Sequence, residues 1–201
     1  MSRLPKIVGF AWGPEKYSDA ADRLRAQCRV QSLRHQIVKR PDLTEHFSRM
    51  PGEFGDRRWV CRWIPTFLKS AMEWVDEGDA ILYLHVDFQV TRSFSPGLFD
   101  ELDVGLQERW SWVPDAPLRC LAAPIYVRRC DASRRFLDVF EALCLGIDDG
   151  NFEHDLLWRT FKLFRKKDRA LRVDFFPGRL AGLHRECGAP IIGHKHEGGS
   201  A

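Results

Sequence analysis

The sequence lacks a long hydrophobic run, an internal repeat and a low-complexity tract in its 201 residues. No apolar stretch approaches the roughly 18 residues that a membrane-spanning helix needs, so we predict no membrane span. The amino-terminal apolar stretch is too short for a secretory signal, and Gly13 and Pro14 break it. We therefore expect a cytoplasmic protein.

Charge of either sign is nearly balanced, because 31 Lys and Arg residues face 28 Asp and Glu residues, for a formal net charge of +3. This balance falls short of the strongly basic composition of a dedicated nucleic-acid binder. The chain is well supplied with core material, since it holds 7 Trp, 3 Tyr and 14 Phe residues. Length and composition predict one folded domain over residues 1–196, followed by a flexible tail over residues 197–201.

The cysteines are scattered along the chain and form no CxxC pair. They lie at positions 28, 61, 120, 130, 144 and 187. In a chain without an export signal we expect them to be reduced thiols.

Hydrophobic patterning predicts strands that alternate with helices. We expect strands at residues 7–11, 36–38, 80–86, 119–127, 171–175 and 190–193. We expect helices at residues 19–28, 64–75, with Pro65 in the first turn, and 131–146, and another that Asn151 caps. Residues 42–58 are polar and contain Pro and Gly, which predicts a long loop. This order is typical of an α/β fold with a mostly parallel sheet.

The end of the apolar strand 80–86 is the most informative feature. His85 and Asp87 lie two residues apart, so in an extended chain both side chains leave the same face. Ligands of open α/β sheets bind beyond the carboxyl ends of strands. A nitrogen and oxygen donor set suits Mn²⁺ or a related metal. The alternative is a turn opened by Asp87 beside a histidine of the core.

The carboxyl-terminal segment contains a group of potential metal ligands. They are His184, Cys187, His194 and His196. Their spacing matches no standard zinc finger, so we prefer a different interpretation. In it, His194 follows a short strand and returns to the metal at Asp87. The alternative is a histidine-containing tail without a role.

A third group opens a helix with the residues Glu153, His154 and Asp155. Carboxylates at this position are favoured by the helix dipole alone, which is one sufficient explanation. The functional interpretation makes Asp155 a wall of the pocket.

These segments, in their order, resemble the nucleotide-diphospho-sugar glycosyltransferases of the GT-A fold. The matching segments are Phe10-Ala11-Trp12 with Tyr17, residues 62–68 from Arg62, His85-Val86-Asp87, residues 123–128, 132–140, 152–158 and 190–194. The resemblance covers nearly the whole chain, although each motif alone is degenerate. One departure is His85, which stands where the family has the first aspartate of its Asp-x-Asp motif.

The resemblance implies a single-domain, three-layer α/β/α fold and a metal-dependent enzyme that transfers a sugar from a nucleotide-diphosphate donor. It implies a Mn²⁺ or Mg²⁺ ion held by Asp87, His194 and His85, and catalytic roles for Asp155 and His154. The donor is expected to contact Ala11, Trp12, Tyr17, Arg62 and Val86. The acceptor is open among a glycan, a protein and a nucleic acid, and the oligomeric state is open too.

Two other functions remain open at this point. The first is a nucleic-acid-binding module that uses the basic run 165–172 and the pairs at 57–58, 128–129 and 134–135, although charge runs are more often solvated helix faces. The second is a degenerate transferase fold that binds a nucleotide sugar without turnover. This alternative is suggested by His85, which replaces the first aspartate of the motif.

Overall fold

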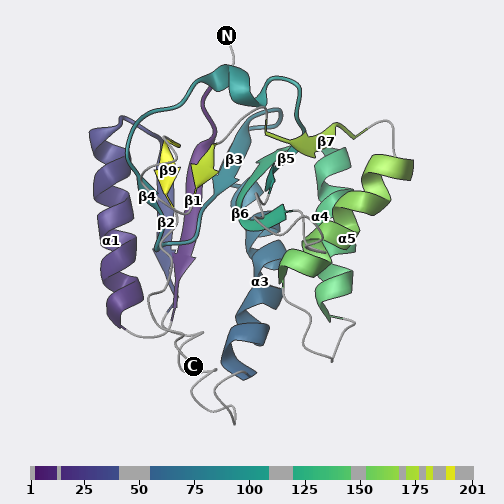
Figure 1. The fold of residues 1–201 in the computed structure, drawn as a ribbon, viewed down its shortest axis with the longest axis horizontal. Coiled ribbons are helices and arrows are strands. Elements are labelled where there is room, and N and C mark those ends of the chain that lie inside the picture. The colour runs from purple at the N-terminus through teal and green to yellow at the C-terminus, as the bar shows by residue number, and fades with distance from the viewer. Residues whose placement is uncertain are drawn as a thin grey trace.

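The computed structural model describes residues 3–12, 15–40, 55–108, 120–145, 153–167, 171–176, 180–182 and 189–192. Within these ranges only the backbone is described at 55–62, 121–122, 153–154, 166–167 and 182. The elements follow one another along the chain as in Figure 1. They are β1 (Lys6–Ala11), α1 (Glu15–Val30), β2 (His35–Lys39), α3 (Gly55–Met72), β3 (Ala80–Tyr83), β4 (Gln89–Val90), the 3-10 helix η1 (Pro96–Phe99), β5 (Val104–Glu108), β6 (Cys120–Arg128), α4 (Asp131–Leu145), α5 (Glu153–Lys167), β7 (Val173–Phe175), β8 (Ala181–Gly182) and β9 (Ile191–Ile192).

The main sheet has six strands in the order β2-β1-β3-β6-β5-β7. The pairs β1–β2, β1–β3 and β5–β7 are parallel, whereas β6 is antiparallel to both of its neighbours. Five strands therefore run in one direction, and the predicted mostly parallel α/β sheet is confirmed. A second sheet of three short strands has the order β4-β9-β8.

Alternate residues of the strands fill two cores, one on each face of the main sheet. Val8, Ile81 and Tyr83 join the core that α3, α4 and α5 cover. Ile7, Leu82 and Leu84 join the core that α1 and the small sheet cover. This alternation follows from the period of two in a strand. The result is the three-layer arrangement that the sequence predicts.

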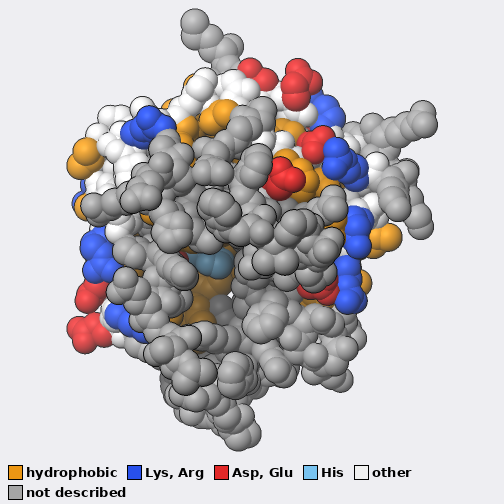
Figure 2. Space-filling view, in the orientation of Figure 1, with side chains coloured by type: hydrophobic (Ala, Val, Ile, Leu, Met, Phe, Trp, Pro, Cys, Tyr) orange, Lys and Arg blue, Asp and Glu red, His pale blue; other side chains and the backbone are white. Residues whose placement is uncertain are grey.

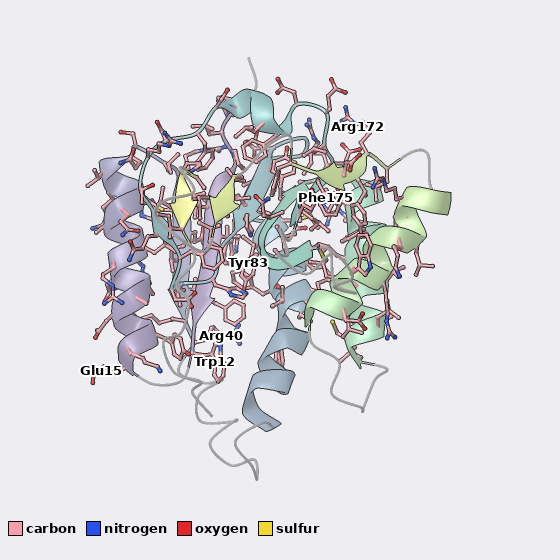
Figure 3. The ribbon with its side chains drawn as sticks, in the orientation of Figure 1. Trp12, Glu15, Arg40, Tyr83, Arg172 and Phe175 are labelled. Atoms are coloured by element: carbon pink, nitrogen blue, oxygen red, sulfur yellow. The ribbon has the colours of Figure 1, made fainter. Side chains whose placement is uncertain are left out.

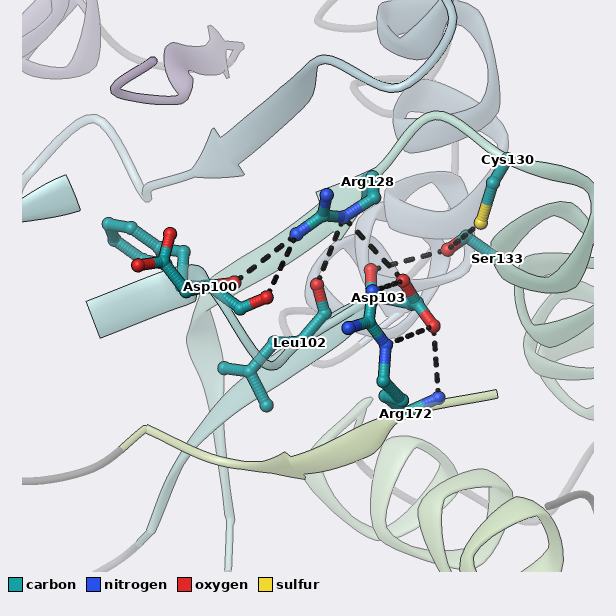
Figure 4. A network of polar contacts seen from close by, with 8 residues as sticks. Asp100, Leu102, Asp103, Arg128, Cys130, Ser133 and Arg172 are labelled. Carbon is teal, nitrogen blue, oxygen red and sulfur yellow. Dashed lines mark hydrogen bonds and ion pairs between the residues drawn. The ribbon is translucent and has the colours of Figure 1, made fainter. Parts of the chain in front are cut away.

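A polar network fastens the edge of the sheet at the amino ends of β5 and β7. The buried Asp103 accepts hydrogen bonds from the Arg172 backbone nitrogen at 3.0 Å and from its Nη2 at 2.8 Å. The Nε atom of Arg128 on β6 lies 3.5 Å from Asp103, and the Ser133 hydroxyl of α4 donates to its carbonyl (Figure 4). Through its carboxylate and its backbone carbonyl, Asp103 thus joins three strands and a helix.

Several predicted elements need correction. Helix α3 begins at Gly55, not at residue 64, so Pro65 lies inside the helix and residues 55–58 are helical. The interior proline is tolerated where Ile64, Phe67 and Leu68 are buried against the sheet. Strand β3 ends at Tyr83, three residues earlier than predicted. Strand β5 was not predicted, although it is central to its half of the sheet.

Within the described part of the chain, no helix is long and apolar enough to cross a membrane. Among the described residues, Cys28, Cys120, Cys130 and Cys144 form no disulfide. Residues 193–201, which include the predicted tail, lie outside the described residues.

Candidate functional site

The candidate site lies at one edge of the main sheet, where β1, β2, β3 and β5 end and β6 begins. The register fixes this edge, because Tyr83 pairs with Ile125, and Glu108 pairs with Cys120 at the start of β6. Figure 3 shows Trp12 and Arg40 at this edge, below Tyr83. The hollow visible in Figure 2 contains a histidine and hydrophobic side chains at its depth. The carboxyl ends of parallel strands are the usual place for ligands in such sheets.

His85 and Asp87 leave the strand in a turn, which corrects the prediction that both belong to an extended strand. Leu84 still donates a hydrogen bond to the Val8 carbonyl at 2.9 Å. The Phe88 amide then donates to the His85 carbonyl at 3.0 Å, which closes the turn. The side chains of His85 and Asp87 are half-buried, and the Oδ1 atom of Asp87 has almost no contact with solvent.

Aromatic side chains fix the ring of His85. Its centroid lies 5.5 Å from that of Tyr83 and 5.6 Å from that of Phe88, and both contacts are edge-to-face. Tyr83 continues the row to Phe67, at 5.9 Å, and to Phe10. The imidazole therefore lies at the rim of the core that α3, α4 and α5 cover. Sequence analysis did not identify Tyr83 and Phe88 as neighbours of His85. The alternation of side chains along the strand, which places Tyr83 on the same face as His85, was the signal that could have shown it.

Trp12 and Tyr17, predicted to contact a nucleobase, lie together beyond β1. Their rings stack at 6.4 Å with an interplanar angle of 15°, and the Lys16 ammonium lies 5.2 Å from the Tyr17 ring. The Arg40 amide donates to the Ala11 carbonyl at 2.8 Å, which brings the end of β2 beside the end of β1. Arg40 is a cation at the site edge that sequence analysis missed; its position between a strand and Pro41 was the signal.

Gly9 allows the chain to turn at His85 by its lack of a side chain. A Cβ atom at residue 9 would lie 2.7 Å from the Leu84 carbonyl oxygen and 3.8 Å from the Val86 side chain. Val86 is buried over this glycine. Its side chain belongs to the core that α1 and the small sheet cover, and its contact with the donor stays a prediction.

Strand β9 pairs with β4, which directly follows the His85–Phe88 turn. Val90 pairs with Ile191 and Gln89 with Ile192. Because the pair is antiparallel, β9 runs toward the end of β4 that is nearer to Asp87. The Thr91 amide and hydroxyl both donate to the Pro190 carbonyl, at 2.9 and 3.0 Å. His194 itself lies outside the described residues.

Helix α5, which bears Asp155 in its first turn, packs against β6. Burial raises the pKa of the Cys120 thiol to about 12, and the negative charge of Asp155 adds to the rise. The Asp155 Oδ2 atom lies 2.8 Å from Nε of Arg159, one turn further along α5. The backbone of His154 and of Arg62 is helical, but their side chains lie outside the description.

Of the three predicted metal ligands, Asp87 and His85 are among the described side chains and His194 is not. No group of three or more His, Cys, Asp or Glu residues that could hold a metal occurs there. Asp87 offers a carboxylate with one buried oxygen, and His85 offers an imidazole two residues away. This oxygen and nitrogen donor set fits Mn²⁺ or Mg²⁺ in kind, and it needs further ligands from elsewhere.

The predicted basic clusters are mostly occupied by carboxylates of the chain itself. Arg129 pairs with Glu73 at 2.6 Å and Arg134 with the same glutamate at 2.8 Å. Arg128 contacts Asp103 and the Leu102 carbonyl. These arginines join secondary-structure elements, so they are poorly placed to contact nucleic acid. The pair at 57–58 lies where side chains are not described.

Comparisons with known proteins agree with this architecture. No protein-family model matches the chain, and no curated protein matches it. Among solved structures, a glycosyltransferase involved in the glycosylation of the major capsid of PBCV-1 matches over 98% of this chain and 95% of its own, at 11% identity and a TM-score of 0.63. The apo form of the glycosyltransferase GlyE of Streptococcus pneumoniae TIGR4 matches 96% of this chain at 14% identity and a TM-score of 0.51, and the match spans 55% of GlyE.

The chain therefore has the fold of a glycosyltransferase over almost its whole length. The GT-A-like fold implied by the sequence resemblance is confirmed.

Proposed function

We propose that the protein is a metal-dependent glycosyltransferase that moves a sugar from a nucleotide-diphosphate donor to an acceptor. The observation that carries this proposal is the antiparallel pairing of β9 with β4, the strand that follows the turn bearing Asp87, in a fold shared with glycosyltransferases. From the pair Gln89–Ile192, two residues lead to Asp87 on one strand and two lead to His194 on the other. Two residues span at most about 7 Å, so an imidazole at 194 can reach the carboxylate.

In this proposal Asp87, His194 and His85 hold Mn²⁺ or Mg²⁺. The ion supplies a Lewis acid that neutralises charge on the departing nucleoside diphosphate. Tyr83 and Phe88 orient the His85 ring through their edge-to-face contacts. The Oδ1 atom of Asp87 is shielded from bulk water. Its attraction to a cation is therefore stronger than it would be in water.

The donor nucleotide contacts the ends of β1 and β2. Trp12 and Tyr17 provide aromatic faces for the nucleobase, and the backbone at Ala11 and Val86 shapes the floor beneath it. Arg62 of α3 and Arg40 after β2 supply positive charge for the diphosphate. Both cations belong to segments that end or pass at this edge of the sheet.

Asp155 and His154 act on the acceptor side. Arg159 holds one oxygen of Asp155, which leaves the other oxygen to accept a hydrogen bond from an acceptor hydroxyl and to orient it. His154 precedes it in the first turn of α5. A nucleic-acid-binding function is less well supported, because Arg128, Arg129 and Arg134 are engaged within the chain.

The test is a search for turnover. The full chain is incubated with Mn²⁺ and a panel of uridine and guanosine diphosphate sugars, and release of free nucleoside diphosphate is measured. We expect release with at least one donor, and none from the Asp87→Asn variant. Binding of a donor with no release under any condition would support the degenerate binder instead, and absence of both would refute the proposal.

A further inference from the structure

Helix α5 has a net charge of +3, equal in size to the formal net charge of the whole chain. Its 15 residues include five Lys or Arg residues and two acidic residues, Glu153 and Asp155. Subtracting these from the 31 basic and 28 acidic residues of the sequence leaves 26 of each kind elsewhere. Both acids lie in the first turn, so residues 156–167 bear positive charge alone. A stretch of twelve helical residues with cations and no acidic residue favours a local electrostatic role.

Three cations form an exposed row along this helix, which we call the α5 basic row: Arg159, Lys162 and Arg165. All three side chains are exposed, and their spacing of three residues keeps them on one side of the helix. Figure 2 shows Lys and Arg side chains gathered along the flank of the molecule that α5 occupies in Figure 1. With a rise of about 1.5 Å per residue, the row extends roughly 9 Å from Arg159 to Arg165.

Aromatic rings beneath the row hold its cations in place. Lys162 Nζ lies 5.5 Å from the Trp158 ring, and the Arg165 guanidinium lies 5.5 Å from the Phe161 ring. Trp158, Phe161 and Phe175 stack on one another at 4.9 to 6.2 Å. These contacts reduce the side-chain entropy that a partner would otherwise have to overcome.

The row already binds carboxylates of the chain itself. Arg159 lies 2.8 Å from Asp155, and Arg165 lies 3.3 Å from Asp174. The Arg165 pair is about half exposed on both sides, and such pairs contribute little to stability. A carboxylate brought by a partner can therefore replace the internal one at small cost.

We propose that the α5 basic row is a docking surface for an acidic polysaccharide acceptor, whose carboxylates contact Arg159, Lys162 and Arg165. This inference rests on the proposed glycosyltransferase function. The row begins at Arg159, one turn from its ion-pair partner Asp155 at the start of α5, and α5 packs against β6, which begins at the candidate site. A chain that follows α5 therefore delivers one end to the candidate site. The surface selects acceptors by charge, while the site acts on the terminal sugar.

Other polyanions fit the row less well. Single-stranded nucleic acid is held by bases that stack on free aromatic faces, whereas Trp158 and Phe161 here stack on each other and on cations. A membrane surface would require several exposed apolar side chains. On the described part of α5, Leu163, at 42% exposure, is the one large apolar side chain that is exposed.

The test measures binding of oligogalacturonate to the full chain by calorimetry, without any donor, at low and at moderate salt. A neutral maltooligosaccharide of the same length, oligothymidylate and vesicles containing phosphatidylserine are the comparators. We expect binding of the oligogalacturonate that weakens with salt, and a loss of about tenfold in affinity in the double variant Lys162→Gln, Arg165→Gln. The matched control Arg23→Gln, Arg29→Gln removes the same charge from the exposed face of α1 and should leave binding unchanged.

The outcomes separate this inference from the proposed function. Equal losses in both double variants, tighter binding of DNA or vesicles, or no binding of the acidic oligosaccharide would overturn the inference. Binding of uridine diphosphate with Mn²⁺ and donor turnover are measured on the same preparations. If turnover occurs while the acidic oligosaccharide does not bind, the function stands and the docking surface fails; the reverse result refutes the function alone.

Discussion

Gln89 of β4 and Ile192 of β9 are direct partners in an antiparallel pair. The pair connects the turn that holds Asp87 to a strand from the far end of the sequence. This relationship is the basis of the proposal that His194 and Asp87 share a metal ion, since in the sequence Asp87 precedes one partner by two residues and His194 follows the other by two.

We therefore expect His194→Ala to weaken Mn²⁺ binding by at least about tenfold, because the ion loses one protein ligand. Mn²⁺ binding in the presence of uridine diphosphate is measured by electron paramagnetic resonance of the free ion. His196→Ala is the matched control and should bind as the unmodified chain does. A larger effect at His196 than at His194 would contradict the assignment.

The close approach of Gly9 in β1 to the Leu84 carbonyl means that a side chain at residue 9 should disturb the turn at His85. Gly9→Ala places a methyl group against the Leu84 carbonyl oxygen, a backbone atom that cannot move aside without shifting the turn at His85. We expect a loss of about 1–3 kcal/mol in the free energy of unfolding, measured by urea denaturation, together with weaker nucleotide binding. Gly97→Ala is the control, because its new Cβ would meet Ser95 at an ordinary 3.5 Å. Equal stability of the two variants would show that the close approach is absent.

Asp103 should make the stability of the protein depend on pH in acid. Burial by itself raises the pKa of this carboxyl, but hydrogen bonds and charge from Arg172, with the charge of Arg128, lower it below its usual range. A lowered pKa in the folded state means that the contribution is fully present above about pH 4, the value for an unfolded aspartate, and is lost as the pH falls through the folded value.

Replacing Asp103 by Asn should lower the free energy of unfolding at neutral pH by about 1–3 kcal/mol, since charged hydrogen bonds are lost while Arg172 remains half exposed. The difference from the unmodified chain should shrink below about pH 4, in urea denaturation followed across the acid range. Asp22→Asn, on an exposed ion pair of α1, should show little change at any pH. A difference that grows in acid would contradict the sign of the pKa shift.

Much of the fold could be predicted because the neighbouring strands β1 and β3 are almost purely apolar. Hydrophobic spacing predicts the presence of β3, α3 and α4, although the predicted end of β3 and the predicted start of α3 are wrong. Strand β5 was missed because Gly105 and Gln107 interrupt its pattern. Gln107 is buried there because its side-chain oxygen accepts hydrogen bonds from the Leu180 and Ala181 amides, at 3.1 and 3.0 Å. Those partners lie more than 70 residues away, so local spacing could not reveal them.

The sequence places the candidate site at the end of β3, and the structure corrects the local geometry of the chain there. The apolar residues Leu84 and Val86 continue the strand pattern past Tyr83, whereas the chain turns at His85. The turn depends on contacts with Gly9 and Phe88, which spacing alone does not encode. Arg40 was missed for a similar reason, because its place at the site depends on the pairing of β2 with β1.

Asp155 allows a test that separates acceptor chemistry from donor binding. Its Oδ2 atom forms an ion pair with Arg159 in the first turns of α5, the helix that packs against β6. If Asp155 orients the acceptor hydroxyl, Asp155→Asn should lower the transfer rate by about a hundredfold or more, while Mn²⁺ and uridine diphosphate bind as before. Glu153→Gln, in the same first turn of α5, is the matched control for the helix dipole and should transfer normally. Steady-state kinetics with varied donor and acceptor give the decisive measurement. A change confined to the KM for the donor would move Asp155 from the acceptor side to the nucleotide side of the site.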